Sequence, residues 1–202
     1  IDNMPKFVME TALSYDNQLY FNALYFPAQA ILLTVGFVYK PLLVRMAQMW
    51  ADAEKRNRFH LVILAIVAMV IALTLVVIFL MGWIGIPIMS FMYGVDFEQF
   101  RGLSFIMIAA GGVTAIIDFL YQVITVLRRQ KSVMKLYVIT FGFSLFVPIL
   151  LIDFTGLPGA VIGYLIVMTI LMVLLVWEYV SICLDLSKHP VSQNPVSVSV
   201  DE

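Results

Sequence analysis

A stripe of polar side chains crosses the apolar stretch "AAGGVTAIIDFLYQVITV", which runs from Ala109 to Val126. At its centre stands Asp118, ten residues away from Arg128, the nearest other charge. Such a face could bind the hydroxyl groups of a substrate, and its carboxylate could carry a coupling proton or cation. Steps of three and four residues place the members of the stripe on one face of a helix: Gly111, Thr114, Asp118, Gln122, Thr125 and Arg129.

A second polar stripe lies earlier in the chain, where Asn22, Gln29, Gly36 and Lys40 share a helical face and Pro27 can bend the helix. Both stripes predict helices that line a cavity. The alternative for both is packing between helices, which uses small and polar residues in similar patterns. We assign a third aligned group to packing: Tyr137, Thr140 and Ser144.

Enzymatic chemistry finds little support in the sequence. The two histidines, His60 and His189, have no spacing that would pair them, and there is no Ser/His/Asp arrangement, no phosphate-binding glycine loop and no metal-ligand spacing. The single cysteine, Cys183, excludes an internal disulfide and offers no cysteine cluster for a metal. We therefore predict a protein that is not an enzyme and that carries neither a metal nor a cofactor.

The composition places the two stripes in a membrane. Hydrophobic residues make up 62% of the 202 residues and charged residues 12%, and the mean hydropathy is +1.00. Soluble domains are roughly 45–50% hydrophobic, and a chain of this length cannot hide so much apolar surface in one water-soluble core. A soluble helical bundle would also need polar helix faces, which residues 61–84 do not have. No nucleic-acid partner is expected.

The chain is predicted to be an all-α, polytopic helical membrane protein. A transmembrane helix needs about 20 predominantly apolar residues, and five stretches meet or nearly meet this length: residues 20–39, 61–84, 103–127, 136–152 and 160–184. Together they define a membrane domain over residues 20–185. Residues 1–19 are expected to form the outer end of a preceding helix and a loop. Residues 186–202 are polar with two prolines, which predicts a disordered tail.

Lysine and arginine residues set the expected orientation, because cytoplasmic connections carry an excess of them. Only Lys6 and Arg101 fall on one side of the five spans. The C-terminus is therefore predicted to be cytoplasmic and the N-terminus to lie outside. Ten of the 12 basic residues fall on the cytoplasmic side: Lys40, Arg45, Lys55, Arg56, Arg58, Arg128, Arg129, Lys131, Lys135 and Lys188.

The connections carry local signals as well. On the outer side, Gly94 suits a turn, Asp96 is suited to the N-cap of the next helix, and residues 153–159 are expected to form a tight turn. The first cytoplasmic connection predicts an amphipathic helix at the membrane interface. Its apolar residues recur at helical spacing: Leu42, Leu43, Met46, Met49 and Trp50.

Four segments, taken in order, resemble a family of transporters. They are "NMPKFVMETALSYDNQLYFNALYFPAQAI", "FVYKPLLVRMAQMW", "IMSFMYGVDF" and "GLPGAVIGYLI". In order and spacing they are similar to the polysaccharide or oligosaccharide flippases of the multidrug/oligosaccharidyl-lipid/polysaccharide exporter superfamily. The likeness extends to about Leu184, and the "YG-x-D-F" turn is its most specific motif.

The resemblance implies a two-lobe transporter with six helices in each lobe and both termini in the cytoplasm. The five spans would form most of its C-terminal lobe, preceded by the outer end of the seventh helix. The implied function is the export of a polyprenyl-pyrophosphate-linked oligosaccharide across the bacterial cytoplasmic membrane by alternating access, for cell-surface polysaccharide such as lipopolysaccharide. The implied partners are this substrate, membrane lipids and the N-terminal lobe, which we expect upstream of Ile1.

The candidate pathway residues come from both stripes and from the cytoplasmic mouth of the expected cavity. The basic residues at this mouth could attract a pyrophosphate group or acidic sugars, or they could fix topology and contact anionic lipids. The full set of candidates is Asp118, Gln122, Thr114, Asn22, Gln29, Lys40, Arg128 and Arg129.

Three other functions stay open at this point. One is a drug/cation antiporter of the same superfamily, and another is a non-transporting membrane scaffold in a polysaccharide assembly complex. The third is a membrane-embedded transferase, which we would expect to carry a large polar loop. The longest loop between the predicted spans is only about twenty residues.

Overall fold

The computed structural model describes residues 15–52, 55–127 and 129–188. These residues are helical almost throughout, and they include no strand. Five helical segments are long and apolar enough to cross a membrane, as the sequence predicts. They are Tyr15–Ala51, Arg56–Tyr93, Phe97–Val126, Gln130–Thr155 and Leu157–Leu184.

The elements follow one another with short connections. In chain order they are α2 (Tyr15–Tyr39), the 3₁₀ turn η1 (Lys40–Leu42), α3 (Leu43–Ala51), α4 (Arg56–Leu80), the π-helical turn η3 (Met81–Gly85), α5 (Ile86–Tyr93), the 3₁₀ turn η4 (Phe97–Phe100), α6 (Arg101–Val126), α7 (Gln130–Thr155) and α8 (Leu157–Lys188).

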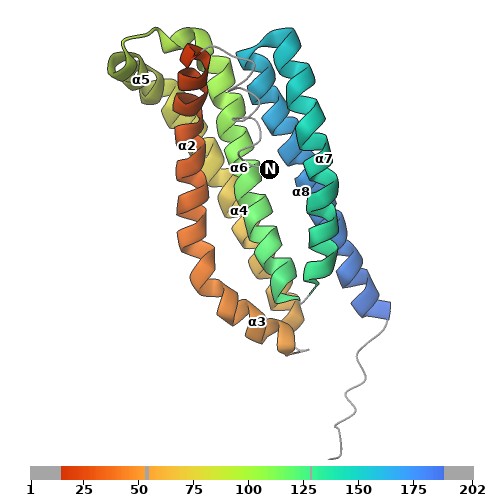
Figure 1. Ribbon diagram of the computed structural model, residues 1–202. Coiled ribbons are helices and arrows are strands. Elements are labelled where there is room, and N and C mark those ends of the chain that lie inside the picture. The colour runs from red at the N-terminus through yellow and green to blue at the C-terminus, as the bar shows by residue number, and fades with distance from the viewer. Residues whose placement is uncertain (1–14, 53–54, 128, 189–202) are drawn as a thin grey trace, which may run out of the picture.

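Helix α6 forms the centre of the bundle (Figure 1). It packs against α2, α4 and α8, whereas α7 packs mainly against α8 and contacts α6 only weakly. Small residues permit the close approaches. A methyl group added at Gly111 would lie 2.7 Å from the Ala28 Cα of α2, and one added at Gly112 would lie 2.4 Å from the Thr74 Oγ1 of α4.

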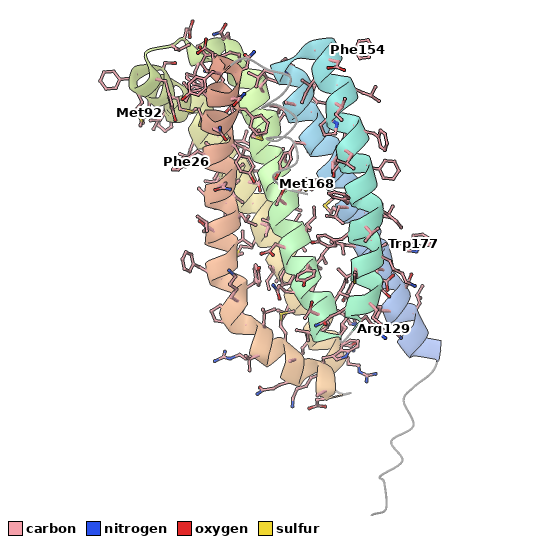
Figure 2. All side chains as sticks on the ribbon, in the orientation of Figure 1. Phe26, Met92, Arg129, Phe154, Met168 and Trp177 are labelled. Carbon is pink, nitrogen blue, oxygen red and sulfur yellow. The ribbon has the colours of Figure 1, made fainter. Side chains whose placement is uncertain are left out.

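The outer surface of the bundle is apolar. Phe26, Phe154 and Trp177 point away from the core (Figure 2), and their exposed fractions are 76%, 85% and 74%. In water such a surface would be a large exposed apolar patch. Together with the five apolar helices, it makes the chain a polytopic membrane protein whose surroundings are lipid.

The two ends of the bundle differ in charge. Helix α3 and the start of α7 lie at one end, whereas α5 and the turn from α7 to α8 lie at the other (Figure 1). The end with α3 holds Lys40, Arg45 and Lys131, and the opposite end holds Asp96 and Asp153. The alternation of basic and non-basic connections along the sequence is therefore a separation in space.

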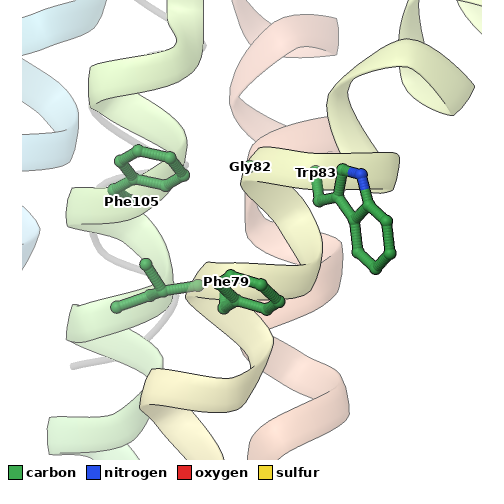
Figure 3. Close-up of a pocket in the computed structure, with 5 residues that line it drawn as sticks. Phe79, Gly82, Trp83 and Phe105 are labelled. Carbon is green, nitrogen blue, oxygen red and sulfur yellow. The ribbon is translucent and has the colours of Figure 1, made fainter.

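The second membrane segment changes its helical pitch near Pro87. Proline has no N–H, and its ring clashes with the carbonyl of the residue four positions earlier. The chain makes a π-helical turn at η3, where the Ile86 N–H donates to the Met81 carbonyl. The Ile86 N–H, the usual donor to the Gly82 carbonyl, is thereby used elsewhere, and Pro87 has no N–H to take its place. Arg101 of α6 donates to this carbonyl at 3.2 Å. Gly82, Trp83 and Phe105 line an open groove beside this turn (Figure 3).

The turns expected on the outer side are present. Gly94 ends α5 in the left-handed conformation with φ of 67°, and the Asp96 side chain accepts from the Glu98 N–H at 3.0 Å, as an N-cap does. Gly156, with φ of 64°, separates α7 from α8. The turn predicted for residues 153–159 is therefore shorter than expected, because residues 153–155 and 157–159 are helical. Residues 43–51 form the helix α3 that the apolar spacing predicts.

Several boundaries differ from the sequence prediction. Helix α4 begins at Arg56 and not at residue 61, and α7 spans Gln130–Thr155 and not residues 136–152. Helix α8 begins at Leu157 and not at residue 160. Residues 15–19 belong to α2 and are not a separate loop, and α8 continues to Lys188, so the expected tail cannot begin at residue 186. In both cases the helix continues past its apolar stretch, because the added residues, such as Asp16 and Lys188, include neither proline nor glycine, the residues that disfavour a helix most. The expected structures of residues 1–14 and 189–202 lie outside the described residues.

Candidate functional site

Asp118 meets a tyrosine of another helix. The Tyr39 hydroxyl at the end of α2 donates a hydrogen bond to Asp118 Oδ2 of α6. Tyr39 is fully buried, and its ring packs on Phe119 at 5.4 Å between centroids. Because Pro41 follows at the start of η1, the chain turns immediately after Tyr39. This turn and the ring contact hold the hydroxyl against the carboxylate.

The carboxylate of Asp118 keeps capacity for further partners. An ionised carboxylate can accept about four hydrogen bonds, and one donor, Tyr39, is found for it among the described residues. Asp118 is half-buried, as are Gln122 and Thr125 on the same helix face. This part of α6 could therefore accept hydrogen bonds from substrate hydroxyls or hold a cation.

The stripe on α6 continues towards the basic end of the bundle. Thr125 donates to the Tyr121 carbonyl of its own helix at 2.9 Å, and Arg129, which precedes α7, is exposed. Tyr121 is also exposed, and its ring meets Tyr137 of α7 edge-on at 5.9 Å. Tyr121, which lies beside the stripe, thus faces α7, and α7 packs only loosely against α6. Arg128 lies outside the described residues.

The upper half of the stripe is occupied by helix packing. Thr114 is buried, donates to the Ala110 carbonyl at 2.9 Å and shares a 3.0 Å hydrogen bond with the Tyr164 hydroxyl of α8. Gly111 lies directly against Ala28. In this structure Thr114 therefore joins α6 to α8, and its part in a pathway stays a prediction.

Most of the stripe predicted on the first span is exposed. Asn22 and Gln29 of α2 and Lys40 of η1 are exposed beside the buried face of the helix, whereas Gly36 is buried. The Lys40 side chain folds back along the helix, so that a methyl group at Gly36 would lie 3.6 Å from its Nζ. These three residues share a surface with one another, and the structure does not bring Asn22 or Gln29 into contact with Asp118.

Thr140 and Ser144 of α7 agree with their assignment to packing. Both are buried, and each donates to a carbonyl of its own helix, at 2.9 Å and 2.7 Å. Pro148, further along the same face, lies against Gly163 of α8. These two buried hydroxyls of α7 are thus satisfied within their own helix.

Sequence reasoning missed the tyrosine partners. Tyr39, Tyr164 and Tyr179 each place a hydroxyl against a polar group of another helix, and the Tyr179 hydroxyl lies 2.5 Å from His60 Nδ1. One general signal was present, because a buried tyrosine hydroxyl usually finds a hydrogen-bond partner. The sequence does not say which partner, since the pairs are 50 to 119 residues apart.

No protein-family model, curated protein or solved structure matches the chain. The class of the protein therefore rests on the structure: a polytopic, all-α membrane protein with a partly buried carboxylate held between two of its helices.

Proposed function

We propose that the chain forms one wall of a substrate pathway in a membrane transporter. The observation that carries this proposal is Asp118, a carboxylate within the most buried of the five membrane segments, held by Tyr39 and flanked by half-buried polar residues. Ionisable groups within membrane spans are costly and mark substrate or ion routes by default.

The open polar faces support a pathway that the described helices only partly enclose. Asn22 and Gln29 are exposed on α2, and Gln122 is half-buried on α6. Exposed amides are unfavourable in lipid. A second wall would cover them, and in a two-lobe transporter that wall is the other lobe. We propose that this lobe belongs to the same protein.

The proposed substrate is a polyprenyl-pyrophosphate-linked oligosaccharide, moved from the inner to the outer leaflet of the bacterial cytoplasmic membrane. The sequence resemblance to polysaccharide flippases is the ground for this choice. The arrangement suits it, because amide and carboxylate groups bind sugar hydroxyls and the exposed Lys40 and Arg129 lie at the basic end, where a pyrophosphate would enter.

The first test replaces Asp118 by asparagine in the complete transporter. Asp118→Asn keeps the shape of the side chain and its ability to accept from Tyr39, but it removes the charge. In cells that depend on this transporter, we expect surface polysaccharide to fall at least ten-fold while the amount of protein in the membrane stays near that of the parent.

Asp153→Asn is the matched control, because Asp153 is exposed at the far end of α7. It should leave both surface polysaccharide and abundance unchanged. Unchanged export by Asp118→Asn would contradict the proposal, and a parallel loss of protein would assign Asp118 to folding. If Asp118→Asn abolished the export of small cationic drugs and left surface polysaccharide unchanged, this result would favour the antiporter instead.

A further inference from the structure

A second feature lies on another face of the bundle, between α4, α6 and α8. It is a groove of about 450 Å³, within the size range of ligand sites. Its wall from α4 extends from His60 to Ile71, which corresponds to about 16 Å along the helix. One leaflet of a bilayer has a hydrocarbon depth of about 15 Å. The groove therefore matches the depth of one leaflet.

The groove is apolar over its length and polar at one end. Isoleucine, leucine, valine and methionine side chains form its walls, and Leu64 and Ile71 are exposed along its open side. His60 and Tyr179 close the end near the start of α4, where they are hydrogen-bonded to each other at 2.5 Å. An acyl chain that entered this groove from the side would contact apolar side chains along its length and polar groups at one end only.

Arg56 stands one helical turn before His60, on the same face of α4. Its guanidinium lies over the ring of Trp50, 5.3 Å from the centroid, and the Trp50 ring in turn meets His60 edge-on. The Arg56 Nε is buried and has no hydrogen-bond partner among the described residues. A buried, unpaired donor is unfavourable, so it calls for an acceptor that the described chain does not supply.

The charge at this end is positive. Arg56 and Arg58 both lie in the first turn of α4, whose N-terminus adds partial positive charge. Lys55 is already paired with Asp52 at 2.5 Å. Among the described residues, Glu178 neighbours Tyr179 in the chain and offsets part of this charge. Glu54, next to Lys55 in the sequence, lies outside the described residues.

We propose that this groove binds one anionic glycerophospholipid of the leaflet at the basic end. An acyl chain would lie along α4 between α6 and α8, and the phosphate would accept hydrogen bonds from the Arg56 guanidinium. Arginine suits this role, because its planar fork of donors matches phosphate oxygens.

The groove beside η3 does not share these features (Figure 3). Ile78, Phe79 and Trp83 line it, and the nearest basic residue, Arg101, is already engaged. Its guanidinium pairs with Glu98 at 2.9 Å and donates to the Gly82 carbonyl at 3.2 Å. An anionic headgroup would find no free positive charge there, so this groove should not distinguish anionic from zwitterionic lipids.

Native mass spectrometry of the 202-residue chain in detergent tests the proposal, with dioleoylphosphatidylglycerol and dioleoylphosphatidylcholine as probes at equal concentration. We expect the parent to retain the anionic lipid in preference. A basic residue near a membrane surface contributes about five-fold in affinity for anionic lipid. Arg56→Gln should lower the preference by about this factor.

Arg58→Gln is the matched control, because it removes the same charge two residues away on a different side of α4. It should change the preference by less than Arg56→Gln does, because it removes a charge near the surface without removing a donor to the phosphate. Ile71→Trp should fill the groove and lower the retention of both lipids. If this variant misfolds, Leu64→Trp on the same wall serves the same purpose. Equal retention of the two lipids by the parent, equal effects of Arg56→Gln and Arg58→Gln, or full retention by the filled variants would each overturn the proposal.

Discussion

At the scale of single residues, the energetics of Asp118 explain why it can reside in a membrane helix. Residues 103–127 hold 13 leucine, isoleucine, valine and phenylalanine residues. On insertion scales these contribute about −4 to −8 kcal/mol, and a central aspartate costs about 2.5 to 3.5 kcal/mol. The helix inserts with its carboxylate. The Tyr39 hydroxyl then lowers the remaining cost, because it supplies a hydrogen bond within the bundle.

The bond between Tyr39 and Asp118 should be measurable as a coupling. Tyr39→Phe removes the donor and should lower the free energy of unfolding by about 1 kcal/mol, since hydrogen bonds between membrane helices average about 0.6 and reach about 1.7 kcal/mol. In the variant Asp118→Leu, the same tyrosine change should cost close to nothing. Unfolding of the four proteins in mixed detergent micelles gives the coupling, and strictly additive effects would show that the contact carries no energy.

The site was predictable in part at this scale. A helical period places Asp118, Gln122 and Thr125 on one face, and the structure keeps them together there, half-buried. Thr114 shares the same period but is buried against Tyr164. Periodicity gives the direction of a side chain from its own helix. It does not give the neighbour on that side, which changes along α6 from α2 and α8 to the looser contact with α7.

At the scale of elements, glycines set how closely α6 approaches its neighbours. Gly111→Val should separate α2 from α6, because even a single methyl group would lie 2.7 Å from the Ala28 Cα and 2.9 Å from its carbonyl oxygen. These are backbone atoms that cannot swing aside. We expect a loss of at least 2 kcal/mol in the free energy of unfolding, as overpacking costs about 1–3 kcal/mol or more, measured in mixed micelles.

The control for this change is Gly142→Ala in the middle of α7. A methyl group there meets no atom within 4 Å. Alanine should leave the protein unchanged or stabilise it by about 0.5–1 kcal/mol, since glycine is the weaker helix former. If Gly111→Val were as stable as Gly142→Ala, the close contact between α2 and α6 would be wrong.

The helices were predictable from hydropathy, but their irregular parts were not. Residues 61–84 form one apolar run, and the structure places a π-helical turn at its end. The cause is Pro87, which lies beyond that run. The consequence is that the Gly82 carbonyl accepts a hydrogen bond from Arg101 of another helix. A pattern of apolar residues predicts the length of a span. It does not predict a hydrogen bond to a residue 19 positions away, such as that from Arg101 to Gly82.

At the scale of the whole molecule, the spatial separation of charge gives the orientation a direct test. The described helices place α3 and the connection from α6 to α7 at one end of the bundle and residues 94–100 at the other (Figure 1). Positive charge near membrane spans is retained on the cytoplasmic side. We therefore expect Asn57, in the first turn of α4, to lie inside the cell and Asp96 to lie outside.

Single cysteines in a background of Cys183→Ala test this orientation. Asp96→Cys should react with a membrane-impermeant maleimide in intact cells, because Asp96 is exposed in the connection between α5 and α6. Asn57→Cys, which is also exposed, should react only after the membrane is permeabilised. Because both positions are exposed, a difference in labelling reports the side of the membrane and not burial. Labelling of Asn57→Cys in intact cells, with protection of Asp96→Cys, would reverse the orientation and place the basic Lys40 and Arg129 at the exit of the proposed pathway.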